Sequence, residues 1–156
     1  MKYEDDYIYS RDIDWFCVIN GLFVHIASAG GMLPDAVNDR DKLREIQRAV
    51  FLAPNLYSEE QINLNELFLN ERFGNDEKAK KEYLKSFVAM SRKGFISVDR
   101  THIADKSNNV YHIVCMPPND GNLPKIENLC HYLCNDADIL NSPKGNIALF
   151  DVIVRE

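Results

Sequence analysis

The sequence predicts a single α+β domain, with helices packed on a largely antiparallel sheet. Strand-like runs occur as neighbouring pairs in residues 14–27 and 95–117, and helical patterns lie between the pairs. The expected order of elements is therefore β-β-α-α-α-β-β-α-β. A length of 156 residues, of which 46% are hydrophobic and 27% charged, suits one globular domain covering residues 1–156. Residues 1–10 are expected either to fray or to form an arm that packs at an interface.

The first pair of strands is predicted from "DIDWFCVINGLFVHIA". Asn20-Gly21 favours a type I′ turn, because both residues tolerate positive φ. This turn sets Phe16 opposite His25 and Trp15 opposite Ile26. One face of the hairpin then carries Trp15, Cys17, Ile19, Leu22, Val24 and Ile26, and the other carries Phe16, Val18, Phe23 and His25. Since both faces are apolar, we expect this hairpin in the middle of the sheet.

Three helical segments follow. Asn38 or Asp39 caps the first, which ends before Pro54 and carries an apolar stripe of Leu43, Ile46, Val50 and Leu52. The second follows a capping box of Ser58 and Gln61, with Leu64, Leu67, Phe68 and Phe73 on its stripe; alternatively, Asn65 begins a shorter helix.

The third helix has the strongest signals at both ends. Asn75 is the expected cap, and acidic residues follow it, where they oppose the positive end of the helix dipole. Arg92 and Lys93 lie at the other end, and Gly94 supplies the left-handed stop. The expected buried face consists of Tyr83, Leu84, Phe87, Val88 and Met90.

The rest of the chain adds strands and one more helix. "GFISVDR" and "NVYHIVCMP" are predicted as a hairpin joined by the polar loop "THIADKSNN", and Pro117 and Pro118 end its second strand. We expect a short helix over residues 123–134 and a closing strand over residues 146–154.

The first candidate site is the loop in "HIASAGGMLPD". Main-chain N–H groups of this loop could converge on an anion beside a following helix, because Gly30 and Gly31 allow close approach, and Ser28 could add its hydroxyl. The loop matches no known phosphate-binding or nucleophile signature. The alternative interpretation is an ordinary turn that leaves a central strand, and we favour it.

The second candidate site is catalytic and consists of Asp99, Arg100, His102 and His112. If the two later strands pair, a carboxylate and histidines gather at one end of the sheet, where they could transfer protons near neutral pH. Arg100 could hold an anionic substrate. The alternative is a solvated surface loop that contains an ion pair.

Two further combinations are weaker. His25 and Ser28 could form a nucleophilic pair, but three residues along a strand span about 10 Å, too far for a hydrogen bond. Cys130 and Cys134 share one face of the expected fourth helix, but a structural zinc needs two more ligands from distant positions. We therefore predict no metal and no cofactor.

The net charge and the distribution of apolar residues limit the kinds of partner and the location that we expect. A net charge of −6 argues against nucleic acid, and no apolar stretch is long enough to span a membrane. The N-terminus lacks the apolar core of a secretory signal, so a cytoplasmic location is expected.

Two functions remain, and whether the protein is an enzyme stays undecided. The preferred one is a non-catalytic module that binds another protein through an acidic surface. The alternative is a small enzyme or ligand-binding domain for an anionic small molecule, which uses the Ser28–Gly31 loop or the Asp99–His112 cluster.

Overall fold

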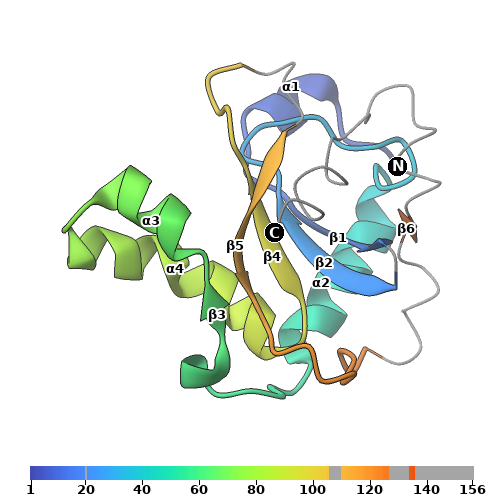
Figure 1. Cartoon of the computed structure of the whole chain (residues 1–156). Coiled ribbons are helices and arrows are strands. Elements are labelled where there is room, and N and C mark those ends of the chain that lie inside the picture. The colour runs from blue at the N-terminus through green and yellow to red at the C-terminus, as the bar shows by residue number, and fades with distance from the viewer. Residues whose placement is uncertain (20, 106–109, 127–133, 136–156) are drawn as a thin grey trace.

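A six-stranded mixed sheet organises the chain (Figure 1). The computed structural model describes residues 1–19, 21–105, 110–126 and 134–135. The strand order is β3-β5-β4-β2-β1-β6, and the strands are β1 (Asp14–Ile19), β2 (Leu22–Ala27), β3 (Asn63–Leu64), β4 (Ile96–Arg100), β5 (Tyr111–Met116) and β6 (Cys134–Asn135). Three neighbouring pairs are antiparallel, while β2–β4 and β1–β6 are parallel. The predicted α+β class with a largely antiparallel sheet is confirmed.

The first hairpin has the predicted register. Phe16 pairs with His25, and Trp15 pairs with Ile26. The two strands lie inside the sheet, because β2 continues to β4 and β1 continues to β6. Trp15, Cys17, Val24 and Ile26 are fully buried on one face, as alternation along the strands requires.

Four helices and a 3₁₀ turn accompany the sheet: α1 (Asp5–Tyr9), α2 (Arg40–Leu52), η1 (Glu59–Gln61), α3 (Glu66–Phe73) and α4 (Glu77–Arg92). Helix α4 packs on β4 and β5, and α2 packs on β1 (Figure 1). Phe16, Val50 and Phe95 fill the core on this side. Among the described residues, no helix is long and apolar enough to cross a membrane.

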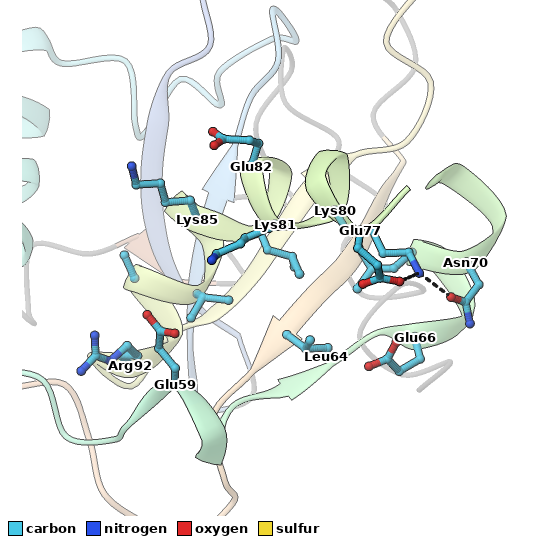
Figure 2. Close-up of a pocket in the computed structure, with 14 residues that line it drawn as sticks. Glu59, Leu64, Glu66, Asn70, Glu77, Lys80, Lys81, Glu82, Lys85 and Arg92 are labelled. Carbon is cyan, nitrogen blue, oxygen red and sulfur yellow. Dashed lines mark hydrogen bonds and ion pairs between the residues drawn. The ribbon is translucent and has the colours of Figure 1, made fainter. Parts of the chain in front are cut away.

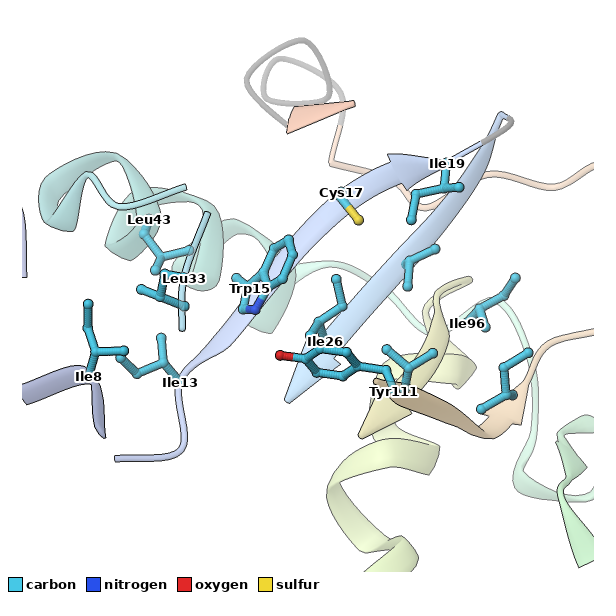
Figure 3. Packing of buried hydrophobic residues seen from close by; sticks show 13 residues of the cluster. Ile8, Ile13, Trp15, Cys17, Ile19, Ile26, Leu33, Leu43, Ile96 and Tyr111 are labelled. Atoms are coloured by element: carbon cyan, nitrogen blue, oxygen red, sulfur yellow. The ribbon is translucent and has the colours of Figure 1, made fainter. Parts of the chain in front are cut away.

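The opposite face of the sheet holds the largest apolar cluster. Figure 3 shows Trp15 from β1, Ile26 from β2 and Tyr111 from β5 within this cluster. Ile8 of α1 and Leu33 pack against them. The sheet is therefore buried on both faces, as the all-apolar hairpin indicated.

The N-terminal segment is folded rather than frayed. Residues 5–9 form α1, and Ile8 on its inner side is only 4% exposed. The main-chain N–H of Tyr3 donates to Asn38 Oδ1 at 2.7 Å, and the rings of Tyr3 and Tyr7 stack 4.7 Å apart. The expected arm thus packs on the protein's own chain.

Helix α2 begins and ends where the sequence indicates. Asp39 caps it by accepting from the N–H of Lys42, and the helix stops at Leu52, before Pro54. Leu52 is 73% exposed, however, so its placement on the buried stripe was wrong. Lys93 Nζ donates to three carbonyls at the end of this helix, those of Val50, Phe51 and Ala53.

Residues 57–74 follow the alternative prediction of a shorter helix. The capping box of Ser58 and Gln61 forms, but it starts only a 3₁₀ turn. The chain then extends as β3, because Asn65 donates from its main chain to Val114 and from its side chain to Ile113 on β5. Asn65 also caps α3 by accepting from the N–H of Phe68. Pairing with a distant strand therefore overrides the local helical signal.

The later hairpin is confirmed, with an irregularity between Ser97 and Val98. Most of the expected 123–134 helix and the whole 146–154 strand lie outside the described residues. The last residue expected in that helix, Cys134, instead begins β6, which pairs in parallel with β1.

The cap of α4 provides a test of the fold. Asp76, not Asn75, caps this helix by accepting from the N–H of Ala79 at 3.1 Å. Replacing Asp76 by Ala should lower the free energy of unfolding by about 1 kcal/mol, measured in urea. Asn75→Ala is the matched control and should change it by less than about 0.5 kcal/mol, as for other surface positions. An equal loss in both variants would mean that the cap is misassigned.

Candidate functional site

The two candidate sites from the sequence lie at the same end of the sheet. Strands β2 and β4 run parallel, with Ala27 paired to Asp99. Ser28 and Arg100, the residues that come directly after this pair, therefore lie at the same end of the sheet. This proximity depends on a strand pairing that the sequence pattern did not predict.

Arg100 links the two loops that leave these strands. Its side chain is fully buried, and the five N–H donors of the guanidinium all reach main-chain carbonyls at 2.7–3.0 Å. The acceptors are Ser28 and Ala29 in the first loop, and His102, Ile103 and Asp105 in the second. The guanidinium thus holds the protein's own backbone, and this geometry gives no support to its expected role on a substrate.

The N–H groups of the Ser28–Gly31 loop are also engaged. Three of them bind the segment 11–13: Ser28 N–H donates to Ile13, Ala29 N–H to the Asp12 carboxylate at 2.9 Å, and Gly30 N–H to Arg11. Gly31 N–H donates to the Ser28 carbonyl. The Ser28 hydroxyl accepts from Ile13 N–H at 2.7 Å. The N–H groups of the loop therefore bond within the chain, three to main-chain carbonyls and one to a carboxylate, and they do not converge on an anion.

Asp99 and His112 come together as predicted from pairing of the strands. They are partners across β4 and β5, and Tyr83 of α4 joins them. Tyr83 Oη donates to Asp99 Oδ2 at 2.6 Å and lies 3.5 Å from His112 Nε2. Thr101 Oγ1 lies 3.1 Å from His112 Nδ1. His102 takes no part in this cluster, because it is exposed on the following loop.

Burial controls the ionisation of this cluster. Desolvation raises the pKa of the Asp99 carboxyl and of the Tyr83 hydroxyl. It lowers the pKa of His112 to about 4, with a smaller contribution from the charge of Arg72. His112 is therefore a neutral imidazole at pH 7. A carboxylate, a phenol and an imidazole could transfer protons, but Asp99 is only 6% exposed.

The aromatic cover of the cluster was missed at the sequence level. The Phe68 ring of α3 lies 3.9 Å from the His112 ring, centroid to centroid. The apolar spacing of the helix had placed Tyr83 on its buried face. This was the one indication in the sequence that Tyr83 would contact the sheet. Nothing in the sequence indicated that α3 would fold over His112, since this requires the pairing of β3 with β5.

His25 forms a hydrogen-bonded chain that sequence reading did not identify. Its Nε2 lies 2.8 Å from Asp14 Oδ1, and its Nδ1 lies 3.0 Å from Ser97 Oγ. This order of acid, imidazole and hydroxyl is that of a hydrolytic triad. However, Ser97 is fully buried and its hydroxyl donates to the carbonyl of Phe87. This series of hydrogen bonds joins β1, β2, β4 and α4. Ser28 does not take part in it.

The described residues offer no metal centre, since they contain no group of three or more His, Cys, Asp or Glu that could hold an ion. Cys17 and Cys115 are buried thiols in the sheet. Cys130, one of the two cysteines considered for zinc, lies outside the described residues.

A groove of about 920 Å³ lies between β3, α3 and α4 and is here called the β3–α4 groove (Figure 2). Its apolar lining consists of Leu64, Leu69, Leu84, Val88 and Ala89. Lys81, Lys85 and Arg92 of α4 line one side together with Glu77 and Glu82 of the same helix, whereas Glu59 and Glu66 flank Leu64 on the other (Figure 2). The groove thus combines apolar surface with a side of mixed charge and an acidic side.

One ion pair fixes the closed end of this groove. Lys80 Nζ donates to Asn70 Oδ1 at 3.0 Å and to Glu77 Oε1 at 3.2 Å (Figure 2). This contact joins the end of α3 to the start of α4. The sequence "KAKKEYLK" predicts a solvated helix face, and Lys78, Lys81 and Lys85 are exposed, whereas Lys80 is only 9% exposed.

Gly31 provides a test of the Arg100 link. A Cβ at this position would lie 2.6 Å from Arg100 Cδ and 2.9 Å from the carbonyl oxygen of Ser28. Because five hydrogen bonds hold the arginine, it cannot move aside without breaking some of them. Gly31→Ala should lower the free energy of unfolding by about 1–3 kcal/mol in urea.

The matched control lies in the same loop. Ala29 adopts a φ of 46°, where glycine is preferred, so Ala29→Gly should be neutral or stabilising. If Gly31→Ala is as stable as the wild type, the loop is not packed against Arg100 as described.

His112 provides a test by pH. Its pKa of about 4 in the folded protein lies below the ordinary value of 6.5, so only the unfolded chain binds this proton between pH 6.5 and 4. Stability must then fall as the pH drops through this window, by up to about 3 kcal/mol from this residue. The raised pKa of Asp99 acts in the opposite direction, since it favours the folded state at low pH.

The contribution of His112 is measured by difference. Asp99 is present in both the wild type and His112→Asn, so the stability gap between the two proteins isolates the histidine. The gap should shrink as the pH is lowered from 7 to 4 in urea unfolding experiments. Parallel curves would contradict the burial of a neutral imidazole.

Comparison of the chain with protein-family models, with curated proteins and with solved structures finds no match. The arrangement of residues is therefore the basis for assigning a function. The two candidate sites predicted from the sequence lie at one end of the sheet, and their hydrogen-bonding groups mostly bond to other groups of the protein. The β3–α4 groove instead presents apolar and charged side chains to the outside.

Proposed function

We propose that the protein is a non-catalytic interaction module that binds an extended peptide segment of a partner protein in the β3–α4 groove. The observation that supports this most is the apolar lining between charged side chains of both signs. The alternative, an enzyme or binding domain for an anionic small molecule, has less support. The groups it would use are the Arg100 guanidinium, the 28–31 N–H groups and the Asp99–His112 cluster, which bond within the chain or are largely buried.

The position of β3 favours an extended occupant. Strand β3 ends the sheet order and pairs with β5 on one side. The N–H of Asn65 points to β5, so alternation along the strand turns the N–H and C=O of Leu64 toward the open edge. An added peptide strand could bond there, while its side chains enter the groove.

The charges favour a polypeptide over a nucleic acid. Four glutamates line the groove, at positions 59, 66, 77 and 82, and they would repel a phosphate backbone. A peptide can place an acidic side chain near Lys81 and Lys85 and a basic one near Glu59 or Glu66. Between them, an apolar side chain would cover Leu64, which is 37% exposed, and Leu84.

Exposed apolar surface continues beside the groove. Leu67 of α3 comes three residues after the end of β3, and its side chain is 77% exposed. A single exposed leucine is ordinary, but one beside an apolar groove extends the surface that a partner could bury. We therefore expect the partner segment to reach α3.

The proposal is tested with a random peptide library selected on the immobilised full-length chain. Enriched peptides should carry an apolar residue flanked by side chains of opposite charge, and their affinities should be measured by calorimetry. Lys85→Glu should weaken binding about tenfold, because a charge-assisted contact becomes a repulsion. Leu64→Ser should weaken it by a similar factor through lost apolar contact.

Lys78→Glu is the matched control. It makes the same charge change on the same helix, at an exposed position that does not line the groove. Its affinity for the peptides should stay within about twofold of the wild type. The proposal fails if no peptide is enriched, or if Lys85→Glu and Leu64→Ser bind as well as the control.

A further inference from the structure

A second groove of about 820 Å³ lies between the N-terminal segment and α2, here called the α1–α2 groove. It shares no lining residue with the β3–α4 groove. Its charged lining residues are Arg11, Arg44, Arg48, Asp12 and Asp14. Three guanidinium groups thus face one hollow of a protein whose net charge is −6.

One wall of this groove comes from the N-terminal segment. The rings of Tyr3 and Tyr7 stack with an interplanar angle of 1°. The Arg11 guanidinium lies 4.4 Å above the Tyr7 ring, so it continues the stack. Cation–π contact of this kind holds the arginine in place while its N–H groups stay in the plane of the guanidinium, available at its edge.

The other wall is a stripe along α2. Arg44, Arg48 and Phe51 are spaced four and three residues apart, so they share one helix face. This stripe lies beside the buried one formed by Leu43, Ile46 and Val50. Phe51 is 76% exposed. Each wall therefore offers both an aromatic ring and a guanidinium group.

The acidic residues of the groove have other partners. Asp12 Oδ1 accepts from the N–H of Ala29, and Asp14 Oδ1 lies 2.8 Å from His25 Nε2. Within the part of the chain that the structure describes, no ion pair or hydrogen bond is recorded for the guanidinium of Arg44 or Arg48. The groove thus holds three guanidinium groups against two carboxylates, and one oxygen of each carboxylate already bonds to another group of the chain.

We infer that the α1–α2 groove binds a small organic phosphate that carries a flat ring. The phosphoryl group lies between the guanidinium groups of Arg44, Arg48 and Arg11, because planar guanidinium groups match phosphate oxygens in pairs. The ring packs on Phe51, which is exposed, whereas Tyr7 already contacts Tyr3 and Arg11. This inference does not rest on the peptide groove, which is on other elements.

Calorimetry with phenyl phosphate and inorganic phosphate on the full-length protein tests this inference. Phenyl phosphate should bind more tightly than inorganic phosphate, because only the former covers a ring. Arg48→Gln should weaken binding of both about tenfold through the loss of a charge-assisted contact. Phe51→Ala should reduce the affinity for phenyl phosphate toward that for inorganic phosphate, and should leave the latter unchanged.

Arg72→Gln is the matched control, since Arg72 is an exposed arginine that does not line the groove. It should bind both probes like the wild type, and all variants should unfold at the same urea concentration. The inference is overturned if neither probe binds at millimolar concentration, or if Arg48→Gln binds like the control. Equal affinity for the two probes would overturn the assignment of the ring.

Discussion

The buried guanidinium of Arg100 is the contact on which the end of the sheet depends. Removing a cation from water costs several kcal/mol unless polar groups replace the solvent. Here five carbonyls of two loops do so, and they satisfy every N–H of the side chain. The same contact explains the glycine at position 31, where a Cβ would collide with the arginine. The parallel pairing of β2 and β4 brings these groups together, and the arginine then fixes how both loops leave the sheet.

Polar networks elsewhere in the core follow the same logic. His25 joins Asp14 to Ser97. The hydroxyl of Tyr83 donates to Asp99 and lies close to His112. These residues include the types that carry out acid–base and nucleophilic chemistry, which is why some attracted attention in the sequence. In the fold they bond to one another, and His25, Ser97 and Asp99 do so at buried positions, where polar groups need partners. These contacts join the strands to one another and to α4.

The groups that face outward belong to the helices. Both α2 and α4 carry an apolar stripe toward the sheet and a second stripe toward a groove. On α4 the second stripe includes Lys81 and Lys85, and on α2 it includes Arg44 and Arg48. The two grooves differ in character, since one has an apolar lining among charges of both signs and the other pairs arginines with aromatic rings. A peptide-binding function and an anion site are thus compatible on one small chain.

The sequence by itself determined the features that depend on local chemistry. Asn20-Gly21 and the alternating side chains set the register of the first hairpin, and the caps and apolar spacing placed α2 and α4. Pairing of the later strands, and with it the proximity of Asp99 to His112, followed from their separation by one polar loop. Even here the local signal had limits: Asn75 and Asp76 are equally good caps, and the first turn of the helix decides between them.

Only the tertiary structure decided which distant segments meet. The parallel pairing of β2 with β4 brings Ser28 to Arg100. The pairing of β3 with β5 turns the start of a predicted helix into a two-residue strand and sets Phe68 over His112. No periodicity in the chain encodes these neighbours, because the choice between strand pairings depends on the packing of the whole core. The α1–α2 groove joins residues 3–16 to residues 44–51, which are far apart in sequence. The β3–α4 groove is lined by consecutive elements, but its shape depends on the pairing of β3 with β5, which the sequence did not predict.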